Sequence, residues 1–515
     1  MEGSQRENTK RIAKNTLMLY VRMLFGMLVS LYTSRVVLQA LGVEDYGIYN
    51  VVGGVVAMFS MVSSSLSSSV SRFLTFELGC GDMERLKCVF STSVSIHIVL
   101  SFIIVVLAET VGVWFLNTQM TIPDSRMVAA NWVFHASIFS FVFCLLNVPY
   151  NASIVAHEHM NIFAYIGIGN ILLRLFIVLY IAYAPWVGDR LITYALLLVI
   201  VNIFVQVFYM FYCRSHFMEC RSKIHFYKAI FKEMGTFAFW NFIGCTAGLL
   251  KEQGVNILLN IFIGPVVNAA RGIAVSVNTA ITSFSGNFMT ALNPQITKSY
   301  AAGDYDYMNS LVERGSRFSF YIMLVFILPV MLETEFILQI WLGSYPEYTV
   351  SFVRLVLIVS IIDVLSGTLI NLQSSTGRIR NYQLAVGGML MMNFPFSYLC
   401  LKLSFLPVSV YVVAIVVALF CLILRLLFLQ RMVEKFSMIV FLQNVSFNVF
   451  KVVLCASMIP LAVYWLMPEG WVRLLVLVPL SMACVLCSIL WIGCSASERS
   501  FIFGKLALAC KKIGL

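Results

Sequence analysis

Two apolar segments carry charged and amide side chains at positions where a membrane-spanning helix would be deep in the bilayer. The run LLKEQGVNILLN contains Lys251 and Glu252, and Asn256 follows Glu252 by four residues, on the same helix face. The run PVVNAARGIAVSVNTAITSFSG contains Arg271 and Asn278. Polar and charged residues inside a membrane are costly, so they usually face a cavity or a partner. We therefore predict that these two helices line a polar site.

Two further arginines lie in apolar runs nearer the N-terminus. Arg22 follows YV in YVRMLFG, and Arg174 lies in NILLRLF. Arg22 is only about 10 Å along the helix from Asn15, so it either extends to the headgroups or faces inward. Arg35, near the other end of the same run, is expected to extend outward. Guanidinium and ammonium groups in a low-dielectric cavity suit phosphate. The predicted substrate-binding residues are Arg22, Arg174, Lys251, Arg271, Asn256 and Asn278.

Carboxylates are scarce in the same region. Asp363, in VSIIDVLSG, and Glu252 are the candidates for binding a coupling ion, Na⁺ or H⁺, and no other cofactor is expected. Two other interpretations remain open. Asp363 can pair with an arginine of the bundle, and Lys251 and Glu252 can neutralise each other. The four cations exceed the two carboxylates, so the predicted cavity is net basic and a poor host for lipophilic cations.

Composition places these residues in a membrane protein. The chain has 515 residues, of which 60% are hydrophobic and 11% charged, with a mean hydropathy of +0.90. Soluble domains are about 25% charged. The apolar runs are continuous and do not alternate with period two, which excludes a transmembrane barrel. We predict an all-α polytopic membrane protein that does not bind nucleic acid.

Fourteen apolar runs are long enough to be spans. They lie near residues 14–40, 46–77, 86–116, 127–155, 160–184, 190–213, 236–262, 266–299, 308–332, 347–374, 380–403, 407–430, 446–467 and 471–494. An even number of spans puts both termini on one side. That side holds 22 lysine and arginine residues, against four in the opposite loops. The asymmetry predicts that both termini are cytoplasmic, and it accounts for the net charge of +11.

The spans fall into two halves that resemble each other. Gly42 ends the first span and Gly81-Asp82 ends the second, while Gly264 and Gly303-Asp304 occupy the equivalent places 222 residues later. A parallel repeat of this kind would place the substrate site between two lobes near the midplane. The predicted divisions are an N-lobe of six spans at 1–213, a basic cytoplasmic link at 214–235, a C-lobe of six spans at 236–432, and two further spans with a tail at 433–515.

Motifs of common enzymes are missing from the sequence. There is no HExxH, P-loop or GxSxG, and the loops between spans are too short for a catalytic domain. His157-Glu158-His159 has the wrong spacing for a metalloprotease helix and is expected to lie in a loop. We predict that the chain is not an enzyme.

The chain resembles the polysaccharide (Wzx-type) flippases of the multidrug/oligosaccharidyl-lipid/polysaccharide exporter superfamily. The resemblance rests on LGVEDYGIYNVVGGVV after the first span, LNPQITKSYAAGDYD after the eighth and the number of spans, and it extends over essentially the whole chain. It implies a flippase of the bacterial inner membrane. Such a flippase moves an undecaprenyl-pyrophosphate-linked oligosaccharide, an O-antigen or capsule repeat unit of lipopolysaccharide or polysaccharide biosynthesis, to the periplasmic leaflet by alternating access.

The resemblance also implies partners and leaves two rivals. The expected partners are the lipid-linked oligosaccharide, the bilayer, and a polysaccharide polymerase and glycosyltransferases. One rival is a cation-coupled multidrug antiporter of the same superfamily, which usually has an acidic residue in its first span and about twelve spans. The other is a non-transporting scaffold of an envelope polysaccharide assembly complex, which charge reversal at the predicted site would leave functional.

Overall fold

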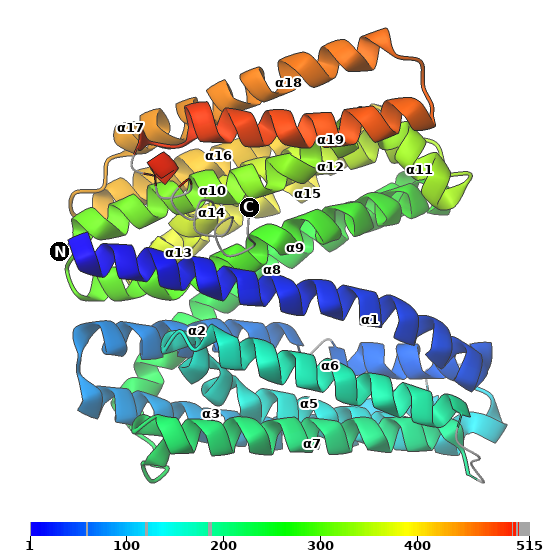
Figure 1. Ribbon diagram of the computed structural model, residues 1–515. Coiled ribbons are helices and arrows are strands. Elements are labelled where there is room, and N and C mark those ends of the chain that lie inside the picture. Colours follow the sequence, from blue (N-terminus) through cyan, green and yellow to red (C-terminus); the bar gives the residue numbers. More distant parts are fainter. Residues whose placement is uncertain are drawn as a thin grey trace, which may run out of the picture. The chain divides into compact units, whose positions relative to one another are not determined.

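The computed structural model describes residues 2–57, 60–118, 122–183, 188–496, 498–500 and 503, and these residues are helical apart from short links (Figure 1). Contacts divide the chain into two compact units. Unit 1 is Met1–Cys245 with Tyr300–Ala302, and unit 2 is Thr246–Ser299 with Gly303–Leu515. The all-α fold predicted from the apolar runs is confirmed for the described residues.

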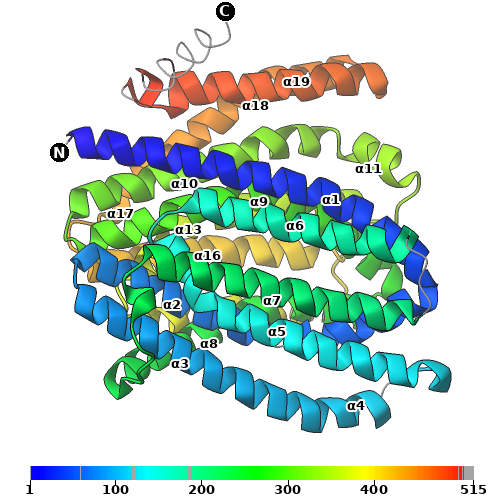
Figure 2. The same cartoon turned by 60° about the horizontal axis from the view of Figure 1, so that its bottom comes forward.

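Unit 1 packs long helices around buried aliphatic and aromatic residues. Val52, Val133, Phe134 and Leu191 belong to one such cluster. Figures 1 and 2 both show α5 and α7 side by side within this unit. Its elements are α1 (Glu2–Ala57), α2 (Ser60–Cys80), α3 (Met83–Leu107), the π-helical η1 (Ala108–Gly112), α4 (Val113–Thr118), η2 (Asp124–Arg126), α5 (Met127–Ala156), α6 (Met160–Tyr183), α7 (Arg190–His216), η3 (Glu219–Arg221) and the first part of α8 (Lys228–Phe262).

Unit 2 begins in the second part of α8. Its core includes Leu259, Ala274, Leu357 and Tyr411, which come from α8, α9, α12 and α16. Its other elements are α9 (Pro265–Ala301), α10 (Tyr305–Leu332), α11 (Thr334–Leu342), α12 (Thr349–Leu365), α13 (Gly367–Ser375), α14 (Arg380–Met391), α15 (Asn393–Lys402), α16 (Ser409–Met432), α17 (Met438–Phe441), η4 (Leu442–Phe447), α18 (Asn448–Leu466), α19 (Trp471–Ser488) and η5 (Ile489–Gly493).

The chain crosses the membrane several times, although the structure supports fewer spans than were predicted. Eleven helical segments of the described residues are long and apolar enough to cross a membrane, and each coincides with a predicted span. The predicted spans without a counterpart among these eleven are 46–77, 236–262 and 266–299. Where described, they are helical, in α1, α2, α8 and α9. The run 46–77 is divided at residues 58–59, which lie outside the described ranges, and α8 and α9 carry many polar side chains. A multi-pass membrane protein is confirmed, and the number fourteen is not.

Two turns of the predicted repeat, 222 residues apart in the sequence, have the same backbone conformation. Gly81 and Gly303 both have positive φ, 76° and 73°, a conformation that favours glycine because it has no Cβ. Asp82 then caps α3 by accepting from the N–H of residue 85, and Asp304 caps α10 by accepting from the N–H of residue 307. The Gly-Asp pairs are therefore helix stop and start signals used twice.

The first pair of equivalent glycines also marks helix breaks. Gly42 (φ 82°) kinks α1, and Gly264 (φ 113°) separates α8 from α9. The boundary of the compact units differs from the predicted link at 214–235. Ser91 of α3 donates to the carbonyl of Lys223, so the link is bound to unit 1, and the units divide only after Cys245, inside α8. The arrangement of the predicted lobes stays a prediction.

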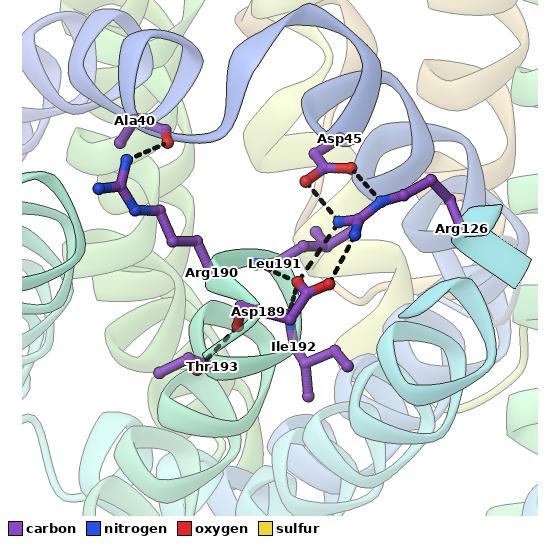
Figure 3. A network of polar contacts seen from close by, with 8 residues as sticks. All are labelled: Ala40, Asp45, Arg126, Asp189, Arg190, Leu191, Ile192 and Thr193. Atoms are coloured by element: carbon purple, nitrogen blue, oxygen red, sulfur yellow. Dashed lines mark hydrogen bonds and ion pairs between the residues drawn. The ribbon is translucent and has the colours of Figure 1, made fainter. Parts of the chain in front are cut away.

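Arg126 joins three segments at one end of unit 1, where the sequence predicts outer loops (Figure 3). Its Nε donates to Asp45 Oδ1 at 2.8 Å, and its Nη1 donates to Asp189 Oδ2 at 2.6 Å. Asp189 also caps α7 by accepting from the N–H groups of Leu191 and Ile192. Burial acts to raise the pKa of Asp189, but the hydrogen bonds from Arg126 and these N–H groups outweigh it and lower that pKa.

Replacing Arg126 with alanine should lower the free energy of unfolding by about 1–2 kcal/mol, because the three side chains are only partly buried and solvent screens the pairs. The effect should depend on pH. The folded pKa of Asp189 lies below its unfolded value of about 3.9, so its stabilisation is complete above that pH and is lost as pH falls through the folded pKa. Denaturant unfolding in detergent at several pH values measures both effects.

The neighbouring Arg190→Ala is the matched control, because within the described ranges Arg190 donates only to the main-chain carbonyl of Ala40. This control should change stability less and should keep the pH dependence of the wild type. An equal loss of unfolding free energy in the two variants would contradict the role given to the network. The same decrease in stability at low pH in Arg126→Ala as in the wild type would also contradict it.

Candidate functional site

Three polar helices lie outside the eleven candidate spans, α2, α8 and α9, and α8 and α9 carry most of the predicted site. Some of their polar groups serve packing. Ser65 and Ser69 of α2 donate to the carbonyls of Ala238 and Met234 in α8, at 2.7 and 3.1 Å. The remaining polar groups of α8 and α9 need another explanation, and the contacts of Lys251 and Arg271 provide part of it.

Lys251 on α8 forms an ion pair with Asp363 on α12. The Lys251 Nζ lies 3.4 Å from Asp363 Oδ2, and their exposed side-chain fractions are 12% and 39%. The distance is long for a charge-assisted hydrogen bond. The ammonium therefore has donor capacity that Asp363 does not use.

Arg271 on α9 forms a second ion pair with Glu252 on α8. Its Nη2 donates to the Glu252 main-chain carbonyl at 2.7 Å and to Oε2 at 3.1 Å. The Nε of Arg271 is buried and has no hydrogen-bond partner among the described residues. Tyr411 of α16 lies within electrostatic range of both side chains of this pair, and its buried hydroxyl is likewise without a partner there.

The two pairs differ from the Lys251–Glu252 pair that the sequence left open. Neighbouring residues on a helix point about 100° apart, so Lys251 and Glu252 cannot face each other. Lys251 turns toward α12 and Glu252 toward α9. The other open interpretation, that Asp363 pairs with a cation of the bundle, agrees with the structure, although the cation is a lysine.

In both pairs the cation is the less exposed partner and the carboxylate is the more exposed one. Arg271 has 11% of its side chain exposed, against 57% for Glu252. An anionic ligand that reaches Lys251 or Arg271 must therefore displace or move a carboxylate. Both carboxylates are open to a small cation or a proton. The arrangement can exchange one ion pair for another, and burial makes each pair stronger than it would be in water.

The predicted asparagines lie close to these pairs along their own helices. Asn256 is half-buried one turn after Glu252 on α8. On α9 the side-chain oxygens of Asn268 and Asn278 are buried and have no partner among the described residues. Buried amides normally find hydrogen-bond partners. Amides without one are suited to binding the hydroxyl groups of a ligand or water.

Arg22 lies in unit 1 and packs across α6. Its guanidinium is 4.3 Å from the centre of the Phe163 ring. A Cβ at Gly167 would lie 2.5 Å from Arg22 Cδ, so glycine is what makes room for the arginine. No carboxylate among the described residues pairs with Arg22. The side chain of Arg35, expected to extend outward, lies outside the described part of the chain.

Arg174 lies on α6, farther along the same face. Its Nε donates to Asn170 at 3.1 Å, and its Nη2 donates to Asn202 at 3.4 Å. It lines a cavity of 440 Å³ in unit 1 together with Ser137, Ser140 and other residues. In unit 2 the structure thus brings Lys251 to Asp363 and Arg271 to Glu252. In unit 1 it places Arg22 of α1 and Arg174 of α6 along one face of α6.

Arg425 on α16 is an intramembrane cation that sequence reasoning missed. It is buried, and it donates to Ser366 at 2.9 Å and to the hydroxyl of Tyr382 at 3.2 Å. Its context, LILRLLF, closely resembles the NILLRLF that singled out Arg174. The signal was present in the sequence. Because neutral groups hold Arg425 within unit 2, it adds positive charge near Asp363 and Cys421.

Comparisons with known proteins agree on the fold. No family model matches the chain. An uncharacterized membrane protein, EpsK of Bacillus subtilis (strain 168), is 21% identical over 325 residues, and the match covers 62% of this chain and 63% of that protein. The chain thus spans less than two thirds of the length of this relative.

Solved structures match over more of the chain. A MATE protein crystallised in a complex has a TM-score of 0.70 at 13% identity and covers 83% of this chain and 97% of its own. An outward-facing multidrug resistance MATE family transporter of the MOP superfamily has a TM-score of 0.68 at 13% identity, with 82% and 95% covered. A MOP superfamily transporter from Pyrococcus furiosus, described as having a binding pocket of reverse polarity, has a TM-score of 0.66 at 14% identity, with 82% and 97% covered.

These matches do not single out the polysaccharide flippases. At such low identity they establish the fold alone. The chain has the membrane-transporter fold of the MATE proteins of the MOP superfamily.

Proposed function

We propose that the chain is a flippase for a lipid-linked oligosaccharide whose lipid carries a pyrophosphate. The observation that carries the proposal is the excess of cations over carboxylates among the charged residues that lie within apolar segments. Lys251 and Arg271 each have one carboxylate, and Arg22 and Arg174 are held by aromatic and amide groups with no carboxylate among the described residues. Such an excess inside a membrane favours an anionic ligand.

The proposed binding step is an exchange of ion pairs. A phosphate oxygen takes the place of Asp363 at Lys251, or of Glu252 at Arg271, and the released carboxylate turns to solvent. The guanidinium of Arg271 adds a donor through its unpaired Nε. Asn256 and Asn278 offer amide groups to sugar hydroxyls. The lipid tail stays in the bilayer.

The direction and setting of transport follow the sequence predictions. We propose that the oligosaccharide is linked to undecaprenyl pyrophosphate and is an O-antigen or capsule repeat unit. It would cross the bacterial inner membrane from the cytoplasmic to the periplasmic leaflet by alternating access, with both termini cytoplasmic. Glycosyltransferases would act before the transport step, and a polysaccharide polymerase would act after it.

A coupling ion would act at the exposed carboxylates. When phosphate occupies Lys251 or Arg271, the released Asp363 or Glu252 can take up H⁺ or Na⁺. Neutralising that carboxylate would favour the substrate-bound state, because a carboxylate that holds H⁺ or Na⁺ no longer competes with the phosphate for Lys251 or Arg271. Proton or sodium binding would thus be linked to substrate binding at the same two pairs.

A second candidate is a cation-coupled multidrug antiporter. The exposed carboxylates favour it, because Glu252 and Asp363 are more accessible than the cations beneath them. The solved structures that the chain resembles include a multidrug resistance transporter. An antiporter would bind a lipophilic cation at these carboxylates, and Lys251 and Arg271 would then oppose binding.

The test is leaflet exchange of a fluorescent undecaprenyl-pyrophosphate oligosaccharide in proteoliposomes, for the wild type and Arg271→Ala. We expect fast exchange in the wild type and about tenfold slower exchange in the variant. The factor is modest because Arg271 already donates to two oxygens of Glu252, so a phosphate gains only part of a charge-assisted hydrogen bond.

Arg354→Ala is the matched control for this test. Arg354 is also a unit 2 arginine, and it is bound to the carbonyl of Met331 and to Glu335, away from the pairs. Equal exchange in all three proteins would keep the flippase and remove Arg271 from its site. No exchange, with pH- or Na⁺-driven efflux of a cationic dye, would favour the antiporter. The absence of both lipid exchange and dye efflux would favour the non-transporting scaffold.

A further inference from the structure

A polar cavity of 570 Å³ lies in unit 2, apart from the ion pairs of α8 and α9. Its walls come from the start of α10, the α16–α17 link, η4, the start of α18 and the residues after η5. These are helix ends. In a membrane protein they lie near the headgroups and not at the centre of the bilayer.

The cavity contains four cations and three carboxylates. Glu498 accepts from both Arg314 and Arg317, at 3.2 and 3.0 Å, so one carboxylate serves two guanidinium groups. Lys435 pairs with Asp306 at 3.2 Å. The third carboxylate, Glu313, accepts from the amide of Asn444. One positive charge therefore remains without a carboxylate.

Lys451 carries that remaining charge. Its Nζ lies 4.3 Å from the centre of the Phe447 ring, and no carboxylate of the described residues pairs with it. The Nε of Arg317 is buried on the cavity wall and has no partner among the described residues, although Arg317 is otherwise bound to Gly493 and Glu498. The cavity thus offers positively charged hydrogen-bond donors that no group of the described residues uses.

Two π-helical segments flank the cavity. η4 contributes Gln443 and Asn444 to its wall, and the carbonyl of Gly493, at the end of η5, accepts from Arg317. π-Helical turns are uncommon and occur frequently at functional sites. Here they place amide side chains and a main-chain carbonyl in and beside a cavity that regular α-helices would line differently.

Apolar side chains of α17, η4 and η5 are also exposed. Phe447 has 56% of its surface exposed, Ile439 65% and Trp491 67%. A polar cavity at headgroup depth beside exposed apolar groups matches an amphiphile with a charged head and hydrocarbon tails. A free anion would use the cations alone and would gain nothing from the apolar rim.

We propose that this cavity binds the phosphate headgroup of a membrane lipid, with Lys451, Arg314 and Arg317 as the phosphate-binding residues. The amides of Gln443 and Asn444 would bind the remaining polar part of the headgroup, and the tails would lie against the exposed apolar side chains of α17 and η4. The proposal does not depend on what the protein transports.

The experiment is a lipid titration of the purified full chain in detergent by native mass spectrometry. The probes are dioleoyl phosphatidic acid, dioleoylglycerol, which has the same tails and no phosphate, and inorganic phosphate. We expect phosphatidic acid to bind at least tenfold more tightly than either, and Arg314→Gln with Lys451→Gln to weaken its binding about tenfold.

The control double variant is Arg378→Gln with Lys402→Gln, which removes the same charge from exposed positions outside the cavity. It should bind phosphatidic acid like the wild type. Lys451→Gln alone guards against misfolding, because Lys451 has no ion pair to lose in the part of the chain that the structure describes. Equal weakening in both double variants, tight binding of dioleoylglycerol, or inorganic phosphate binding as tightly as the lipid would each overturn the proposal.

Discussion

Replacing Arg473 with alanine is expected to lower the free energy of unfolding by about 3–5 kcal/mol. Arg473 of α19 donates to both oxygens of Glu333, at 2.7 and 2.9 Å, and its guanidinium lies 4.7 Å from the centre of the Tyr464 ring. Glu333 is 1% exposed. The alanine variant leaves a buried carboxylate without its partner, and that is the unfavourable state that produces the large loss.

The pair connects the start of α19 to the α10–α11 junction inside unit 2. α18 and α19 lie side by side in Figures 1 and 2, so a loosened α19 should take α18 with it. Thermal and denaturant unfolding in detergent measure the loss. Limited proteolysis of the link between the two helices reports whether they detach first.

Two further variants separate the buried pair from general damage. Arg473→Met with Glu333→Gln removes both charges and should recover most of the stability, because a buried pair replaced as a whole is often neutral. Arg354→Ala breaks the exposed contact with Glu335 at 3.5 Å and should lose at most about 1 kcal/mol. A loss below 1 kcal/mol in Arg473→Ala would mean that water reaches Glu333.

The sequence predicts the helices well because their signals are local. Apolar runs of sufficient length identify eleven spans, and the Gly-Asp pairs at 81–82 and 303–304 predict where a helix stops and the next begins. The polar runs of α8 and α9 also stand out by their residues alone. The count of fourteen spans is not confirmed, and in α8 and α9 the residues that mark the site are also residues that reduce apolar character.

The partners of the site residues are not predictable in the same way. Lys251 and Asp363 are 112 residues apart, and Arg473 and Glu333 are 140 apart. Helical period gives the face on which a side chain lies, but it does not give the neighbouring helix on that face. The helical period alone could have excluded one open interpretation, a pair between Lys251 and Glu252, because adjacent residues on a helix point in different directions.

Lys251→Met is expected to slow leaflet exchange of the lipid-linked oligosaccharide about 100-fold. Under the proposed function its ammonium binds phosphate, and a charge-assisted hydrogen bond contributes about 1.5–3 kcal/mol. The upper part of that range applies because Lys251 is largely buried and its contact with Asp363, at 3.4 Å, is long. The fluorescent exchange assay in proteoliposomes measures the rate, and thermal unfolding confirms that the variant folds.

Asp363→Asn should act in the opposite sense on binding. Without its carboxylate the ammonium is free for the phosphate, so half-saturation should occur at lower substrate concentration, while release and therefore the maximal rate should fall. If Asp363 also takes up the coupling ion, the rate of this variant should no longer respond to pH or Na⁺. If the rate of this variant still responds to pH or Na⁺, the coupling ion binds at Glu252 or outside these two pairs.

The double variant Lys251→Met with Asp363→Asn decides between a binding and a structural role for the pair. If the pair only holds α8 to α12, removing both charges should restore exchange, as replacing a whole buried pair restores stability. If Lys251 binds the substrate, the double variant should stay as slow as Lys251→Met, because the phosphate still lacks its cation. Exchange at the wild-type rate in Lys251→Met itself would remove the lysine from the site, and the excess of cations within the apolar segments would then no longer support an anionic substrate at this pair.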